Sequence, residues 1–185
     1  MGFMLRIGLC LFFIFSFIGL TGCATNASVE KMAYHHQGSK QPSDKTLLNG
    51  IAVNQVSGGH ETNPLWTSQI NNENFKQALV KSLQQANLYN HSTKPRYVLE
   101  ANLMRLDQPL VGFDMTASCQ VDYTLRDVKQ NKIVYKDAIL ASYTAKLGEA
   151  FLGMERLKKA TEGAAKANIQ KLIEVLYQKR INKTE

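Results

Sequence analysis

The sequence predicts an α+β fold, a two-layer sandwich in which two helices cover one face of a mainly antiparallel sheet of about four strands. Two segments carry apolar residues at helical spacing, and one long segment alternates strictly between apolar and polar residues. Two further segments alternate in the same way on either side of that long one. The expected order is β-α-β-β-β-α.

The first half of the expected domain contains one strand and one helix. The strand is predicted at Leu47–Val56 and ends at the Gly58-Gly59 pair. The helix is predicted at Asn72–Asn87, because asparagine is a favoured N-cap residue and apolar side chains follow at helical spacing. These apolar positions are Phe75, Ala78, Leu79, Leu83 and Ala86.

The second half is predicted to contain three strands and a long helix. Strands are expected at 97–103, 113–126 and 133–143, with the hairpin turn at Lys129–Lys132. The middle strand alternates most regularly, which is typical of an antiparallel strand with one wet face. The last helix is expected from about Glu149 to about Gln178. Asn168 falls in its apolar stripe, so we expect a buried amide that hydrogen-bonds to neighbouring backbone.

The beginning of the chain has the pattern of a lipoprotein signal peptide. Arg6 precedes an apolar run at Ile7–Leu20, which is shorter than the ~20 residues that a membrane-spanning helix needs. The residues Leu20-Thr21-Gly22-Cys23 resemble the lipobox of bacterial lipoproteins. That resemblance implies diacylglycerol on Cys23, cleavage before it, and a fatty acid such as palmitate on the new amino group. The alternative is an ordinary signal peptide with a chance cysteine.

The expected domain organisation has three parts. Residues 1–22 form the signal peptide, residues 23–46 a lipidated and mobile tether, and residues 47–185 a single α+β domain. Lipoproteins with aspartate after the lipidated cysteine tend to stay on the inner membrane, whereas Ala24 follows Cys23 here. By resemblance to that rule, we expect an outer-membrane anchor with the domain in the periplasm. His35 and His36 in the tether are interpreted as solvated side chains rather than metal ligands.

Charge and cysteine content restrict the possible partners. The net charge of +7 is spread along the chain, which is typical of a solvated surface and argues against a nucleic-acid partner. Of the three cysteines, Cys10 is lost with the signal peptide and Cys23 carries the lipid. Cys119 therefore has no partner for an intramolecular disulfide, and its place in the alternation predicts a buried thiol.

The mature sequence contains no recognised catalytic or metal-binding motif. Gly-x-Ser-x-Gly, His-Glu-x-x-His, Walker and Cys-x-x-Cys patterns are all absent. Asp114 and Asp122 are separated by ~27 Å along a strand, so they do not form a catalytic pair. We therefore expect a protein that is not an enzyme and that uses no cofactor or metal.

Three segments carry a resemblance to a family of small, uncharacterised proteobacterial lipoproteins. They are Asn72–Leu88, Leu103–Asp114 and Glu155–Ile169. Members sometimes carry a label that links them to UDP-N-acetylglucosamine acyltransferase, but the hexapeptide repeats that this class requires are absent. The element order is also similar to that of YajG-type lipoproteins and of the lipopolysaccharide-assembly lipoprotein.

Two functions remain open on the sequence. The leading hypothesis is an anchored, non-enzymatic subunit of an envelope assembly, for example the outer-membrane complex of a secretion system, that docks through a strand face or edge. The alternative is a periplasmic module that binds a lipid or glycan in a pocket between helices and sheet. Candidate lining residues for that pocket are Trp66, Phe113, Tyr123 and Tyr143.

Overall fold

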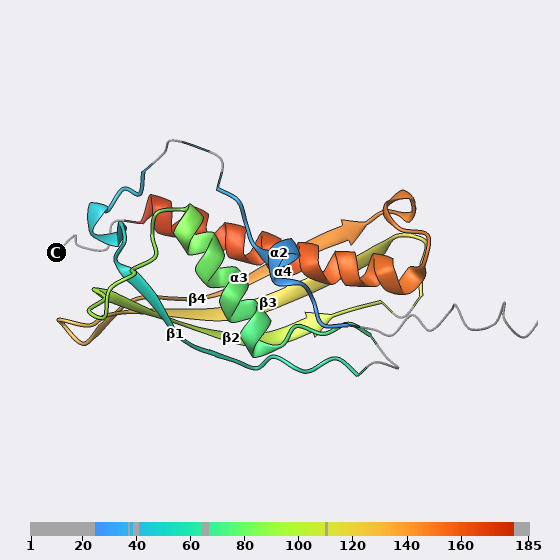
Figure 1. Cartoon of the computed structure of the whole chain (residues 1–185), viewed down its shortest axis with the longest axis horizontal. Helices are drawn as coiled ribbons and strands as arrows, with labels where there is room; N and C mark the ends of the chain where they lie inside the picture. The colour runs from blue at the N-terminus through green and yellow to red at the C-terminus, as the bar shows by residue number, and fades with distance from the viewer. Residues whose placement is uncertain (1–24, 37, 39–40, 64–66, 110, 180–185) are drawn as a thin grey trace, which may run out of the picture.

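The computed structural model describes residues 25–36, 38, 41–63, 67–109 and 111–179. Two helices lie across one face of a twisted sheet, so the predicted α+β two-layer sandwich is confirmed (Figure 1). The main elements are β1 (Ile51–Ser57), α3 (Asn72–Gln85), β2 (Tyr97–Asp107), β3 (Met115–Asp127), β4 (Lys132–Ala145) and α4 (Gly153–Gln178). The short elements are α2 (Val29–Met32) and the 3₁₀ helices η1 (Lys45–Leu47) and η2 (Leu147–Glu149).

The four strands follow the order of the chain in one open sheet, β1-β2-β3-β4. β2, β3 and β4 pair in an antiparallel manner, as the alternation predicts. β1 pairs parallel to β2, because α3 carries the chain back across one face before β2 begins.

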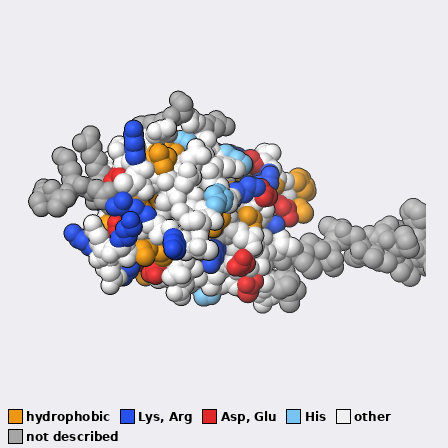
Figure 2. All heavy atoms as spheres, turned by 60° about the vertical axis from the view of Figure 1, so that its left-hand side comes forward, with side chains coloured by type: hydrophobic (Ala, Val, Ile, Leu, Met, Phe, Trp, Pro, Cys, Tyr) orange, Lys and Arg blue, Asp and Glu red, His pale blue; other side chains and the backbone are white. Residues whose placement is uncertain are grey.

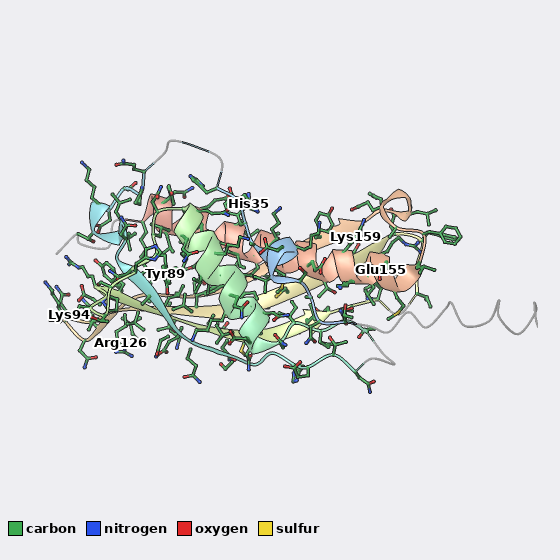
Figure 3. The ribbon with its side chains drawn as sticks, in the orientation of Figure 1. His35, Tyr89, Lys94, Arg126, Glu155 and Lys159 are labelled. Carbon is green, nitrogen blue, oxygen red and sulfur yellow. The ribbon has the colours of Figure 1, made fainter. Side chains whose placement is uncertain are left out.

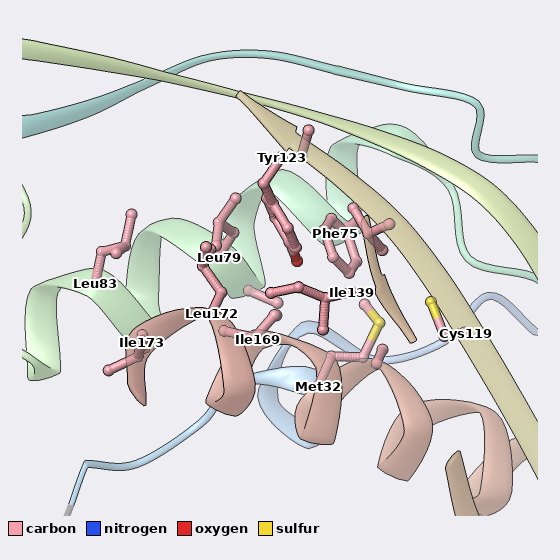
Figure 4. Packing of buried hydrophobic residues seen from close by; sticks show 14 of the residues in the cluster. Met32, Phe75, Leu79, Leu83, Cys119, Tyr123, Ile139, Ile169, Leu172 and Ile173 are labelled. Carbon is pink, nitrogen blue, oxygen red and sulfur yellow. The ribbon is translucent and has the colours of Figure 1, made fainter. Parts of the chain in front are cut away.

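The core lies between the helices and the inner face of the sheet. Every second residue of β3 from Met115 to Asp127 is buried, which is the alternation seen in the sequence. Tyr123 projects from β3 towards Phe75 of α3 and Ile169 of α4, and all three side chains are fully buried (Figure 4). The apolar stripes of both helices therefore cover the same sheet face.

Three predicted boundaries differ from the structure. Leu47 belongs to η1 rather than to the first strand, because the Asp44 side chain accepts from Thr46 N and caps a helical turn. Phe113 precedes β3 and is 82% exposed, so it lies outside the alternating segment. The chain forms η2 before α4, which begins at Gly153 instead of near Glu149.

The segment predicted as a mobile tether is packed where the structure describes it. Ala27, Met32 and Ala33 are fully buried, and α2 lies against both α3 and α4. Tyr34 N donates to Ser82 Oγ at 2.9 Å and so joins the segment to α3. The prediction is therefore wrong for residues 25–34: a few apolar side chains are enough to dock a polar segment.

Candidate docking surfaces

The four aromatic residues predicted to line a ligand pocket are not brought together. Tyr123 is a core residue, whereas Phe113 is exposed at one end of the molecule. Tyr143 is 40% exposed on β4, and Trp66 lies outside the described residues. The helix–sheet interface around Tyr123 is filled by apolar side chains, so this interface does not provide the expected pocket.

Tyr143 instead borders an open groove of about 650 Å³ beside α4. Its ring lies directly against Gly163, where an added Cβ would come within 2.3 Å of Tyr143 Cδ1. Lysine and glutamate side chains line the remaining walls, including Glu155 and Lys159, which Figure 3 labels along α4. The groove is therefore charged and open, a form that suits polar ligands.

Several of the charged groups in this groove are already engaged with the chain. Glu162 is nearly buried and accepts from Ser28 N at 2.8 Å. Burial raises the pKa of the Glu162 carboxyl above its ordinary value, although that hydrogen bond opposes the shift. Lys158 Nζ donates to Thr25 Oγ1 at 2.6 Å, and Lys159 Nζ donates to the Glu149 carbonyl.

The buried polar residues have structural roles. Asn168 is fully buried, and its Nδ2 donates to the carbonyl oxygens of Cys119 and Ile139 at 2.9 and 2.7 Å, as the sequence predicts. Cys119 is also fully buried, and burial raises the pKa of its thiol to about 12. A thiol that stays protonated inside the core is a poor nucleophile.

The histidines and carboxylates do not assemble a metal site within the described ranges. In these residues, no three side chains of His, Cys, Asp or Glu come together in a way that would hold a metal ion. The His36 ring stacks against Tyr177, with ring centroids 4.6 Å apart, so it packs on the fold rather than projecting into solvent. Asp114 pairs with Lys146 in a loop, whereas Asp122 lies on the outer sheet face.

The outer face of the sheet is a broad polar surface that none of the described helices covers. Cross-strand hydroxyl pairs run along it, Thr116 with Thr144 and Ser118 with Ser142, each at 2.8 Å between the oxygens. Leu140 and Ala138 of β4 lie exposed on the same face, opposite Gln120 and Asp122. This surface is accessible, and acidic, basic and hydroxyl side chains are mixed across it.

β4 is also an edge strand of 14 residues. None of the described strands pairs with its outer side. Lys171 Nζ of α4 donates to the Leu140 carbonyl at 2.8 Å and so satisfies one backbone group near the edge. A long edge with unpaired backbone groups is a site where another chain adds a strand.

Two further properties of the described residues concern the distribution of charge and the hydrophobicity of the helices. Lys and Arg side chains are scattered over the visible face rather than collected in one patch (Figure 2). None of the described helices combines the length and the apolar character that crossing a bilayer requires.

Comparisons with known proteins identify the fold. No protein-family model matches the sequence, and no curated protein matches it. A DUF330 protein from Xanthomonas campestris aligns with a TM-score of 0.52 and 10% identity, covering 77% of this chain and 93% of its own. A Caulobacter crescentus protein described as a lipoprotein aligns with a TM-score of 0.49 and 17% identity, covering 71% of this chain and 90% of its own. PelC of Paraburkholderia phytofirmans, solved as a dodecamer, aligns with a TM-score of 0.49 and 16% identity, covering 76% of this chain and 95% of its own. The likeness to the Xanthomonas protein, at 10% identity, concerns the fold alone.

Proposed function

We propose that this protein is a lipid-anchored, non-enzymatic lipoprotein that docks onto envelope proteins through β4 and the outer sheet face. The observation that carries the proposal is the long edge strand β4 beside an uncovered polar sheet face. Strand addition at β4 would supply main-chain hydrogen bonds, and the side chains of the outer face would select the partner.

The proposed location rests on the sequence around the anchor. The lipobox ending at Cys23 supports lipidation, and Ala24 in place of aspartate supports transfer to the outer membrane, with the domain facing the periplasm. The partners would be proteins of an envelope assembly, of which the outer-membrane complex of a secretion system is one example. Nucleic acid is not a partner in this proposal.

Site-specific photocrosslinking in the native cells tests the docking surface. A photoreactive amino acid at Ala138 or Leu140 samples the outer face of β4, and both positions are exposed. The matched control is Gln84, an exposed position of α3 on the opposite layer. We expect defined envelope proteins to crosslink to the β4 positions and not to Gln84. Equal products from all three positions, or none from β4, would contradict the proposal.

A second candidate function is the binding of a polar lipid headgroup or glycan in the groove beside Tyr143. The specific observation in its favour is the volume of about 650 Å³ bordered by Tyr143, Lys158, Lys159 and Lys166. Native mass spectrometry of the purified protein distinguishes the two functions. A co-purifying small molecule that is lost in Lys166→Ala would favour binding in the groove, and an unliganded spectrum would favour protein docking.

A further inference from the structure

We propose that an exposed apolar tip of the domain inserts into the same membrane leaflet that holds the lipid on Cys23. The inference rests on the lipid anchor of the proposed function and adds a second membrane contact. The apolar tip consists of Val111 (86% exposed), Phe113 (82%), Leu147 (51%), Phe151 (96%), Leu152 (53%) and Met154 (44%). So many large apolar side chains at one end of a domain indicate an interaction site.

Hydrogen bonds hold the two loops of the tip together. Asp114 accepts from Lys146 Nζ and from Leu147 N, both at 3.0 Å, which ties the loop of Phe113 to the loop that begins at Leu147. The cation also lowers the pKa of Asp114, so the carboxylate stays charged at neutral pH.

A residue of α4 fixes the second loop, which contains Ala150 and Phe151. Arg156 of α4 donates from one guanidinium nitrogen to the carbonyl oxygens of Ala150 and Phe151, at 2.7 and 2.8 Å. These bonds satisfy the loop backbone while the Phe151 side chain points outward, with 96% exposure. The tip is therefore presented in a defined conformation.

The chain length between anchor and domain places the membrane at this end. Thr25 is bound to Lys158, and only Ala24 lies between Thr25 and Cys23, so their Cα atoms are at most ~7 Å apart. Lys158 lies one helical turn after Met154 of the tip, ~6 Å along α4. The leaflet that holds the lipid is thus close to the apolar tip, which identifies the leaflet as its occupant.

The composition of the tip is suited to shallow insertion. Loop backbone groups are costly in the hydrocarbon core, so the side chains enter only the interfacial region, ~5–10 Å deep. Lys146, with 68% of its side chain exposed, and Lys159 stand beside the apolar residues. Besides its bond to Asp114 or to the Glu149 carbonyl, each ammonium group keeps further N–H donors for lipid phosphates.

Fluorescence of the full-length lipoprotein in vesicles tests the inference. The probe is an environment-sensitive maleimide dye on Phe151→Cys or Phe113→Cys, in vesicles of phosphatidylethanolamine and phosphatidylglycerol that contain nitroxide-labelled lipid. Buried Cys119 and lipidated Cys23 do not compete for the dye. The matched control is Gln130→Cys in the β3–β4 turn, ~40 Å from the tip along β3. Figure 3 places Lys94 and Arg126, near that turn, at the opposite end from Glu155 and Lys159.

We expect a blue shift and nitroxide quenching for the dye at Phe151 and Phe113, and neither for the dye at Gln130. Lipidated protein whose tip dye keeps its aqueous spectrum would overturn this inference alone. A blue shift without nitroxide quenching would do the same, because it would assign the tip to a second copy or another protein. A mass spectrum without lipid on Cys23 would overturn both the anchor and this inference.

Discussion

Tyr123 of β3 donates its phenolic hydrogen to Oδ1 of Asn168 in α4, at 2.9 Å, with both residues fully buried. The same amide donates to carbonyl oxygens of β3 and β4. Burial raises the pKa of Tyr123 well above its ordinary value, so the phenol remains a donor at physiological pH. One side chain thus joins the helix to two strands at the centre of the core.

Replacing this amide is expected to destabilise the domain. Asn168→Leu removes three buried hydrogen bonds and leaves the Tyr123 hydroxyl without its acceptor, a loss of about 2–4 kcal/mol. Urea-induced unfolding followed by circular dichroism measures the change.

A double-mutant cycle isolates the Tyr123–Asn168 bond. We expect Tyr123→Phe to cost about 1 kcal/mol, and the double variant to be less destabilised than the sum of the two changes. Strict additivity would mean that the two side chains do not interact.

Gly163→Ala should destabilise the domain although alanine is the better helix former. The new methyl group would overlap the ring of Tyr143, because the distance to Cδ1 would be 2.3 Å. We expect a loss of about 1–2 kcal/mol in the otherwise native protein. In a Tyr143→Gly background, which also removes the Tyr143 Cβ at 2.9 Å from the new methyl group, the same change should instead add about 0.5–1 kcal/mol, which is the helix-propensity gain. Thermal unfolding of the native protein, the two single variants and the double variant measures these changes. Equal effects of Gly163→Ala in both backgrounds would refute the contact.

Cys119 should resist thiol reagents until the domain unfolds. Its pKa of about 12 leaves almost no thiolate at neutral pH, and the side chain is fully buried. Reaction with an aromatic disulfide reagent should follow the urea unfolding curve, with an exposed cysteine such as Gln130→Cys as the fast control. Because the folded pKa is raised, stability should fall as pH rises from about 9 towards 12.

Glu162 should make stability depend on pH in the acidic range. Its folded pKa is raised by burial, so its contribution is complete below the ordinary value of 4.5 and is lost as pH rises through the folded pKa. Glu162→Gln keeps an acceptor for Ser28 N without the charge. We therefore expect the variant to gain stability relative to the native protein between pH 4 and pH 7. A stability difference that does not change with pH would contradict the shift.

Met32 tests whether the segment before residue 47 belongs to the folded domain. Its side chain is fully buried in the main core cluster, so Met32→Ala should cost about 2–5 kcal/mol. The matched control is Lys31→Ala, one position away at an exposed site, where we expect a change within about 0.5 kcal/mol. Denaturant unfolding of both variants is sufficient, and equal curves would indicate a mobile tether after all.

Local periodicity was sufficient to predict most elements. The strict alternation of β3 and the helical spacing of α3 each reflect a single buried face, which leaves its period in the sequence. The buried amide of Asn168 was also predictable, because a polar residue in an apolar stripe requires partners. By contrast, the segment around Ala27 and Met32 has too few apolar residues to form a periodic pattern. The sequence therefore did not predict that this segment docks on the helices.

By itself, the sequence determined the two-layer fold class, the approximate bounds of its main elements and the expectation of a lipid on Cys23. These depend on neighbouring residues and on a contiguous motif. Only the tertiary structure decided that β1 runs parallel to β2, that Tyr143 lies on Gly163, and that Asp114 joins the loop of Phe113 to the loop that begins at Leu147. Those relationships join residues far apart in the chain, and the packing of the whole core, rather than local pattern, sets them.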